Sequence, residues 1–237
     1  GGTLIMNRVN YGDQRFHRIL RTTDPSLKLI GTEGDRLVIG AGVTMSEIAR
    51  SSDVGFLAPA ARAVGGPAIR NMATVGGNLM APHPYGDFAV ALLALDASLR
   101  MVGGEEINLE EFLAQRSGLV HSVLLRRPQG DAFRFRKVSR VKPKGVSVMS
   151  MAAHMGRSAG RLSGVRVAYG AMGPNPLRAR AVESALEGAS LDAAGIAPAL
   201  AVATEGLDPP DDALASAWYR REVAPVHLRR LLLGEMA

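Results

Sequence analysis

The segment from Gly65 to Asp87, GGPAIRNMATVGGNLMAPHPYGD, constrains this chain most, because glycines and small polar residues crowd into one turn-rich stretch. Its centre, TVGGN at residues 74–78, combines two residues that lack a Cβ with a hydroxyl and a carboxamide. Glycine backbones adopt positive φ readily, and amides without intervening side chains can approach a bulky anion. The segment therefore predicts a loop for phosphate or ribose oxygens. An apolar run, FAVALLALDA, follows it directly.

The composition predicts a globular protein with a sizeable core. The chain has 237 residues, of which 47% are hydrophobic, a size that ordinarily forms one or two domains. No window holds eighteen uninterrupted apolar residues, and the start does not resemble a secretory signal, so we expect no membrane span and a cytoplasmic location. The absence of cysteine excludes disulfides, thiolate nucleophiles and cysteine-ligated iron–sulfur clusters within this sequence.

The net charge of +6 raises the question of nucleic-acid binding. The arginines are scattered, only residues 134–144 form a dense basic patch, and aromatic residues make up 5% of the chain, so stacking platforms are scarce. We therefore expect no nucleic-acid partner. A solvated basic face or a subunit contact explains the charge instead.

The N-terminal half shows alternating strand and helix signals. A strand is predicted at Arg36–Gly40, and the capping box TMSE at 44–47 predicts a helix that ends at Arg50. Asp87–Leu95 is typical of a buried helix with Asp87 as its N-cap, and strands are expected at 98–102 and 119–125. The chain begins with Gly1 and not with Met, so we expect that preceding sequence is missing.

The C-terminal half predicts a sheet followed by helices. In the strand Phe133–Arg140, Phe133, Phe135 and Lys137 share one face, whereas Arg134, Arg136 and Val138 share the other. Further strands at 145–154 and 162–168 complete a three-stranded meander. Helices are predicted at 177–186, 191–204 and 213–233, and the break at Gly130 predicts a domain boundary there.

The TVGGN motif, with IRNMA before it and APHPYGDFAVALLALDA after it, closely resembles the FAD-binding (medium) subunit of molybdenum hydroxylases of the xanthine dehydrogenase and carbon monoxide dehydrogenase type. That family carries two flavin-pyrophosphate loops, AGGT plus an aliphatic residue and T-(I/V)-G-G-N. Residues 1–5, GGTLI, supply the first. The stretches PLRARAVESALEG and WYRREVAPVHLRRLL extend the resemblance to the C-terminal half.

The resemblance implies an α+β fold with two parts. Residues 1–129 would form an FAD-binding domain of the vanillyl-alcohol-oxidase/PCMH type that lacks its N-terminal piece. Residues 130–237 would form a C-terminal domain with a three-stranded antiparallel sheet and helices. It also implies FAD on this chain, the molybdenum cofactor on a large partner subunit and [2Fe-2S] clusters on a small one, and it allows a dimer of heterotrimers.

By the same resemblance, specific residues are expected to contact FAD. The glycines would let main-chain amides replace the hydration of the pyrophosphate, and the hydroxyl and amide side chains would add hydrogen bonds. The expected FAD-binding residues are Gly1, Gly2, Thr3, Leu4, Ile5, Val64, Gly65, Thr74, Gly76, Gly77, Asn78, Asp87, Val120 and Lys137.

Several of these residues have a second interpretation. Asp87 could bond a flavin hydroxyl, cap its helix, or do both. Lys137 begins a K-x-x-R pattern and could stabilise the anionic reduced flavin, or its ammonium could extend to water from a strand edge. Gly65 could form an ordinary turn. His83 and Tyr85 could approach the flavin, but a surface loop explains them better.

No arrangement of residues suggests acid–base, nucleophilic or metal chemistry, because the five histidines are dispersed. The resemblance implies an electron relay from partner clusters through FAD to an acceptor such as NAD or a quinone. Two other functions stay open: a stand-alone FAD-dependent oxidoreductase, and a non-catalytic basic interaction protein. The first predicts turnover by the isolated chain, and the second predicts a colourless protein.

Overall fold

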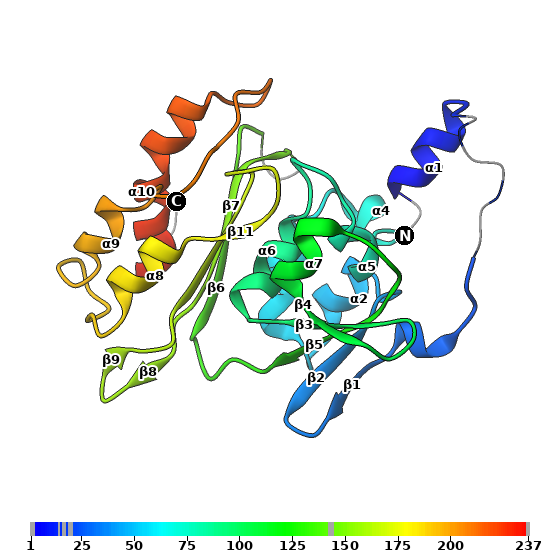
Figure 1. The fold of residues 1–237 in the computed structure, drawn as a ribbon, viewed down its shortest axis with the longest axis horizontal. Coiled ribbons are helices and arrows are strands. Elements are labelled where there is room, and N and C mark those ends of the chain that lie inside the picture. The colour runs from blue at the N-terminus through cyan, green and yellow to red at the C-terminus, as the bar shows by residue number, and fades with distance from the viewer. Residues whose placement is uncertain (1–2, 14, 16–17, 19–20, 142–144, 236–237) are drawn as a thin grey trace.

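The computed structural model describes residues 3–13, 15, 18, 21–141 and 145–235. Within them the chain forms two antiparallel sheets with one buried helix between them (Figure 1). The first sheet has the strand order β1-β2-β5-β3-β4 and the second β11-β10-β7-β6. This arrangement confirms the predicted α+β class.

The first sheet belongs to the N-terminal half. Its strands are β1 (Ile30–Glu33), β2 (Arg36–Gly40), β3 (Ser98–Met101), β4 (Glu106–Asn108) and β5 (Val120–Arg126). The helical elements of this half are α1 (Thr3–Asn10), η1 (Pro25–Lys28), α2 (Met45–Arg50), η2 (Gly55–Leu57), α3 (Ala58–Ala63), α4 (Pro67–Arg70), α5 (Val75–Leu79), α6 (Asp87–Ala94) and α7 (Leu109–Gln115). The predicted strand at 36–40 is confirmed.

The predicted capping box starts α2. The Thr44 Oγ1 accepts the Glu47 N–H at 3.2 Å, and the Glu47 carboxylate accepts the Thr44 N–H at 2.7 Å. Thr44 also forms an isolated antiparallel bridge with Thr74, the residue that caps α5. Two short helices thus begin side by side.

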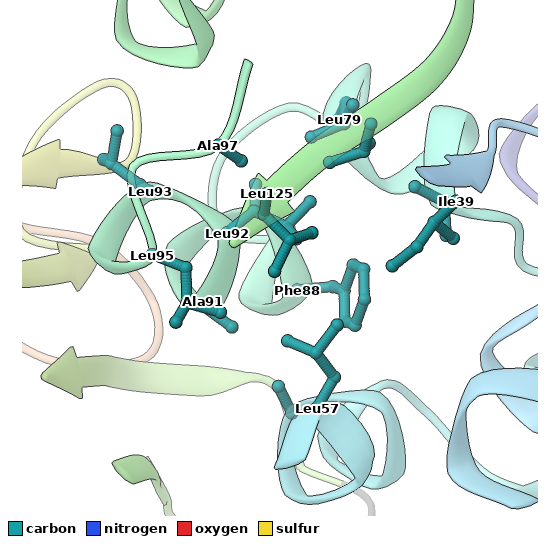
Figure 2. Close-up of a cluster of buried hydrophobic side chains, with 14 of the residues drawn as sticks. Ile39, Leu57, Leu79, Phe88, Ala91, Leu92, Leu93, Leu95, Ala97 and Leu125 are labelled. Atoms are coloured by element: carbon teal, nitrogen blue, oxygen red, sulfur yellow. The ribbon is translucent and has the colours of Figure 1, made fainter. Parts of the chain in front are cut away.

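The helix α6 is buried along its whole length. All eight of its residues are buried, and Figure 2 shows Phe88 and Leu92 among side chains such as Ile39, Leu57 and Leu125. Burial of each large apolar side chain contributes about 1.5–3 kcal/mol. The helix is apolar on every side because it has neighbours all around it. It packs on β7 and β10 of the second sheet and on α3 and α5, and its side chains share one hydrophobic cluster with those of the first sheet, such as Ile39 and Leu125.

The prediction that Asp87 caps α6 is wrong. The N-cap is Gly86, whose φ of +105° is a conformation that favours glycine, and Asp87 is the first helical residue. The Asp87 carboxylate instead faces the second sheet, where it has two side-chain partners.

The second sheet has four strands and not three. They are β6 (Phe133–Ser139), β7 (Ser147–His154), β10 (Arg166–Gly170) and β11 (Leu177–Arg178), and a small hairpin of β8 (Arg157–Ser158) and β9 (Arg161–Leu162) projects from it. The third predicted strand starts late because Gly164, at φ +61°, separates Leu162 from β10. Two hydrophobic clusters lie on the two sides of the second sheet: the first surrounds α6 and includes residues of the first sheet, and the second lies between the second sheet and the C-terminal helices. The predicted faces of β6 are confirmed, because Phe133 and Phe135 pack on the first cluster and Val138 packs on the second.

Three helices cover the outer face of the second sheet: α8 (Arg180–Leu186), α9 (Ala197–Ala201) and α10 (Ala217–Leu233) (Figure 1). The helix predicted from Leu177 begins later because residues 177–178 pair with β10. The helix predicted at 191–204 shrinks to α9, since the Asp192 carboxylate accepts the amides of Ala194 and Gly195 and so forms a turn.

Candidate functional site

The TVGGN motif forms the start of α5. Thr74 is its N-cap, and the Thr74 Oγ1 accepts the Gly77 N–H at 3.2 Å. The Val75 and Gly76 amides donate to the carbonyls of Val43 and Ala41, both at 2.9 Å, and the Asn78 amide donates to the Thr74 carbonyl. All four amides therefore have partners within the chain. The hydrogen bond of the Gly77 amide is the longest of the four, so it is the one that a phosphate would replace most readily.

The two glycines of the motif differ in their surroundings. A Cβ on Gly76 would lie 3.0 Å from the Ala41 Cβ and 3.2 Å from the Ala41 carbonyl oxygen. Gly76 is thus required because its segment packs closely against Ala41, the residue that follows β2. Gly77 is half-buried, and its amide donates a hydrogen bond to the hydroxyl of Thr74.

Asn78 connects two helices. Its side chain is 8% exposed, and its Oδ1 accepts the Ala89 N–H at 3.1 Å, which fixes α5 against the first turn of α6. The sequence alone favours a ligand contact for this carboxamide, and the structure adds a connecting role.

The loop after α3 is held by an arginine. Gly65 has φ +51°, and its carbonyl accepts the Arg70 Nη1 at 2.6 Å. The same nitrogen donates to the Arg62 carbonyl at 3.2 Å. Val64, the C-cap of α3, is half-buried and packs on the first hydrophobic cluster. Arg70 therefore fixes the Val64–Gly65 turn.

A buried ion pair connects three regions of the chain. The Lys137 Nζ donates to the Asp87 Oδ2 at 2.9 Å and to the Ala63 carbonyl at 2.8 Å, and the Ser147 hydroxyl donates to the Asp87 Oδ1 at 2.5 Å. The side chains of Lys137 and Asp87 are 14% and 9% exposed, so the ammonium of Lys137 does not extend to water. Ala63 directly precedes the Val64–Gly65 turn. The structure thus joins Val64–Gly65, Asp87 and Lys137, which are far apart in sequence.

Ser147 and Ser150 are candidate site residues that the sequence analysis did not name. Ser150 is the cross-strand neighbour of Lys137, and its Oγ is buried without a partner among the described residues. The only sequence signal is the presence of serines in an otherwise apolar strand, VSVMSMAA. Together these groups offer a carboxylate, an ammonium and hydroxyls in one buried cluster.

The remaining predicted residues lie elsewhere. Val120 is the half-buried first residue of β5 and packs on the first hydrophobic cluster. Gly1 and Gly2 lie outside the described residues, and Thr3 begins α1, on which Leu4 and Ile5 are 40% and 52% exposed. His83 contacts Asp212, and Tyr85 is exposed.

The described residues contain no group of three His, Cys, Asp or Glu side chains placed to hold a metal ion. In that same part of the chain, no helix is long and apolar enough to cross a membrane. A surface groove of about 550 Å³ lies where β6 meets α10, lined by residues such as Phe56, Phe135 and Arg230, and none of the predicted site residues lines it.

Comparisons with known proteins identify the same family as the sequence motifs. Residues 1–126 match the family described as FAD binding domain in molybdopterin dehydrogenase, and residues 134–234 match the CO dehydrogenase flavoprotein C-terminal domain. The chain is 26% identical to the glyceraldehyde dehydrogenase medium chain of Sulfolobus acidocaldarius, over 74% of this chain and 66% of that protein. It is 26% identical to the xanthine dehydrogenase FAD-binding subunit of Escherichia coli O157:H7, over 81% of this chain and 72% of that one.

A solved structure agrees. Carbon monoxide dehydrogenase from Hydrogenophaga pseudoflava superimposes with a TM-score of 0.78 at 25% identity, over 88% of this chain and 77% of that one. The predicted family, fold and flavin cofactor are thereby confirmed. The chain belongs to the FAD-binding flavoprotein family of molybdopterin dehydrogenases.

Proposed function

We propose that this chain is the flavoprotein subunit of a multi-subunit molybdenum hydroxylase. It would bind FAD, receive electrons from [2Fe-2S] clusters on a small partner subunit and deliver them to an external acceptor such as NAD or a quinone. The observation that carries the proposal is the buried cluster of Asp87, Lys137 and Ser147 beside the Val64–Gly65 turn, in a chain of this family. The large partner would hold the molybdenum cofactor and oxidise the substrate.

The residues of the cluster fit a flavin dinucleotide by their chemistry. The Asp87 carboxylate can accept a hydrogen bond from a flavin hydroxyl, and the partnerless Ser150 hydroxyl is a further buried polar group on the same strand pair. At the phosphate end, Thr74 and Gly77 are half-buried. When bound, FAD supplies one- and two-electron redox chemistry.

Lys137 supplies the positive charge of the site. An ammonium in a buried position acts on nearby negative charge more strongly than it would in water, because the local dielectric constant is lower. Lys137 is held by Asp87 and the Ala63 carbonyl, so its position is defined before any ligand arrives. We infer that it favours the reduced, anionic form of the flavin.

The assembly is part of the proposal. The relatives are described as a medium chain and a FAD-binding subunit, which supports a chain that acts with partners. We place the boundary between the two domains near Gly130 and the protein in the cytoplasm. The groove and basic residues near β6 and α10 give the C-terminal domain a surface for a subunit contact.

The test measures FAD binding by the isolated wild-type chain and by a variant of the TVGGN motif. Gly77→Ala introduces one methyl group at the third helical position of α5, where alanine should favour the helix by about 1 kcal/mol over glycine. If the loop holds FAD, the variant should stay folded and lose FAD, measured by quenching of flavin fluorescence. Gly31→Ala is the matched control, since a Cβ there meets no atom within 4 Å.

Two results would count against the proposal. Wild-type protein that refuses added FAD would remove its central claim, and a Gly77→Ala variant that binds FAD normally would show that the loop is misassigned. Turnover of a substrate by the isolated chain would favour the stand-alone oxidoreductase. Copurification with a cysteine-rich small chain and a large molybdenum-containing chain would favour the relay.

A further inference from the structure

The segment from His83 to Asp87 follows the glycine motif and leads into α6, and its histidine reaches the C-terminal half. The His83 Nε2 lies 3.2 Å from the Asp212 Oδ2. The side chains of His83 and Asp212 are 26% and 24% exposed, so the contact is mostly shielded from water. Because an ionised carboxylate only accepts hydrogen bonds, the His83 Nε2 carries the proton in this contact.

The Asp212 carboxylate is a fixed acceptor. Its Oδ1 accepts the amides of Leu214 and Ala215 at 2.8 and 3.1 Å, and both of its oxygens accept the Arg220 Nη2, at 3.0 and 2.9 Å. Burial would raise the pKa of Asp212, but the hydrogen bonds from Ala215, His83 and Arg220 outweigh it and hold that pKa at about 2. The carboxylate therefore stays ionised at ordinary pH.

Arg220 joins this acceptor to the second sheet. Its side chain is fully buried, its Nε donates to the Val148 carbonyl at 2.9 Å, and its Nη1 donates to the Pro210 and Ala215 carbonyls. Val148 follows Ser147, whose hydroxyl donates to Asp87. Both ends of the segment 83–87 are thus attached to the start of β7, one through Asp212 and Arg220 and the other through Ser147.

The segment also lies close to the C-terminal half at Gly86. A Cβ on Gly86 would lie 3.8 Å from the Pro176 Cγ, and the φ of Gly86 is +105°. The path into α6 is therefore held by side-chain hydrogen bonds at His83 and at Asp87, and it passes close to Pro176 at Gly86.

We propose that His83 is a positioning residue: its hydrogen bond to Asp212 holds the segment 83–87 against the C-terminal sheet and thereby presents Asp87 to the flavin. This inference rests on the proposed FAD-binding function. His83 itself does no chemistry in it. The hydrogen bond has a charged acceptor, so its loss should cost more than the loss of an ordinary surface contact.

The experiment compares three variants of the full chain. His83→Ala removes the donor, and His83→Gln keeps an N–H donor. Arg221→Ala is the control: it removes the exposed ion pair between Arg221, which is in α10 like Arg220, and Asp208, which is in the loop that also holds Asp212. Hydrogen–deuterium exchange of residues 82–88 is measured in flavin-free protein, and the FAD dissociation constant is measured in parallel. Urea unfolding confirms that each variant is folded.

We expect His83→Ala to speed exchange in 82–88 and to weaken FAD binding, each by roughly tenfold. His83→Gln should restore both to within about twofold, and Arg221→Ala should change neither. Unchanged exchange in His83→Ala would overturn the inference, as would a His83→Gln variant that behaves like alanine. Faster exchange with normal FAD affinity would overturn the positioning role and leave FAD binding intact, whereas wild-type protein that binds no FAD would overturn the proposed function itself.

Discussion

The two ends of the segment 74–87 are held by different kinds of contact. At the front, the TVGGN motif is fixed by main-chain hydrogen bonds to residues 41–43 and by the cap of Thr74. At the back, Asp87 is fixed by side chains that lie 50 and 60 residues away, those of Lys137 and Ser147. The front depends on the shape of the chain, whereas the back depends on charge. Mutations at the two ends should therefore change the free energy of unfolding for different reasons.

The largest effect is expected at the back. Asp87→Ala leaves the Lys137 ammonium buried without its counter-ion, which should lower the free energy of unfolding by about 3–5 kcal/mol. Urea unfolding measures it. The double variant Asp87→Ala/Lys137→Met removes both charges and should recover a large part of the loss. A double variant no more stable than Asp87→Ala would show that shape and not charge matters at this end.

A smaller effect is expected at the front. Gly76→Ala places a methyl group 3.0 Å from the Ala41 Cβ, and overpacking of this kind costs about 1–3 kcal/mol. Ala41→Gly, combined with it, should restore most of the stability because it removes the opposing methyl group. Thermal unfolding of the wild type, of Gly76→Ala and of the double variant measures these changes in stability. An unaffected Gly76→Ala variant would refute the packing role of this glycine.

Acidification should weaken the attachment of His83 to Asp212. The pKa of Asp212 is lowered to about 2 from its ordinary value of 3.8, so the folded state binds this proton less readily than the unfolded chain. The resulting stability is complete above about pH 4 and is lost as the pH falls towards 2, and it should amount to less than about 2 kcal/mol because water screens a partly exposed carboxylate. The free energy of unfolding at pH 4, 3 and 2 measures it. Asp212→Asn should show a shallower decline over this range, and an equal decline would contradict the assignment.

The smallest effect is expected at the cap. Thr74→Val removes the hydroxyl that accepts the Gly77 amide and should lower the free energy of unfolding by about 1 kcal/mol. Thr32→Val, on the exposed strand β1, is the matched control and should be nearly neutral. If the two variants lose the same stability, the cap of Thr74 contributes nothing of its own.

The sequence predicted what local patterns determine. The capping box of α2, the strand β2 and the two faces of β6 depend on residues close together in the chain, and all three are confirmed. The motif at 74–78 identified the family because its residues are contiguous. The sequence could also predict that Lys137 lies on the face of the phenylalanines, since alternation alone decides it.

The rest depended on tertiary contacts. Nothing local shows that Asp87 pairs with Lys137, so the pattern before α6 favoured a cap that Gly86 provides instead. The residues 177–178 carry a helical pattern, but β10 offers them main-chain partners. Ser147 was missed because a single serine in an apolar strand gives no sign of what it faces.

The bridge between Thr44 and Thr74 makes α2 and α5 start as one unit. The Met45 amide donates to the Ala73 carbonyl at 2.8 Å, and the Val75 amide donates to the Val43 carbonyl at 2.9 Å. The segment before each helix thus accepts a hydrogen bond from the first residue of the other helix. A change in the surroundings of α2 would therefore be transmitted to the glycine motif through these hydrogen bonds. A partner that docked near Thr44 would thereby also shift the TVGGN motif.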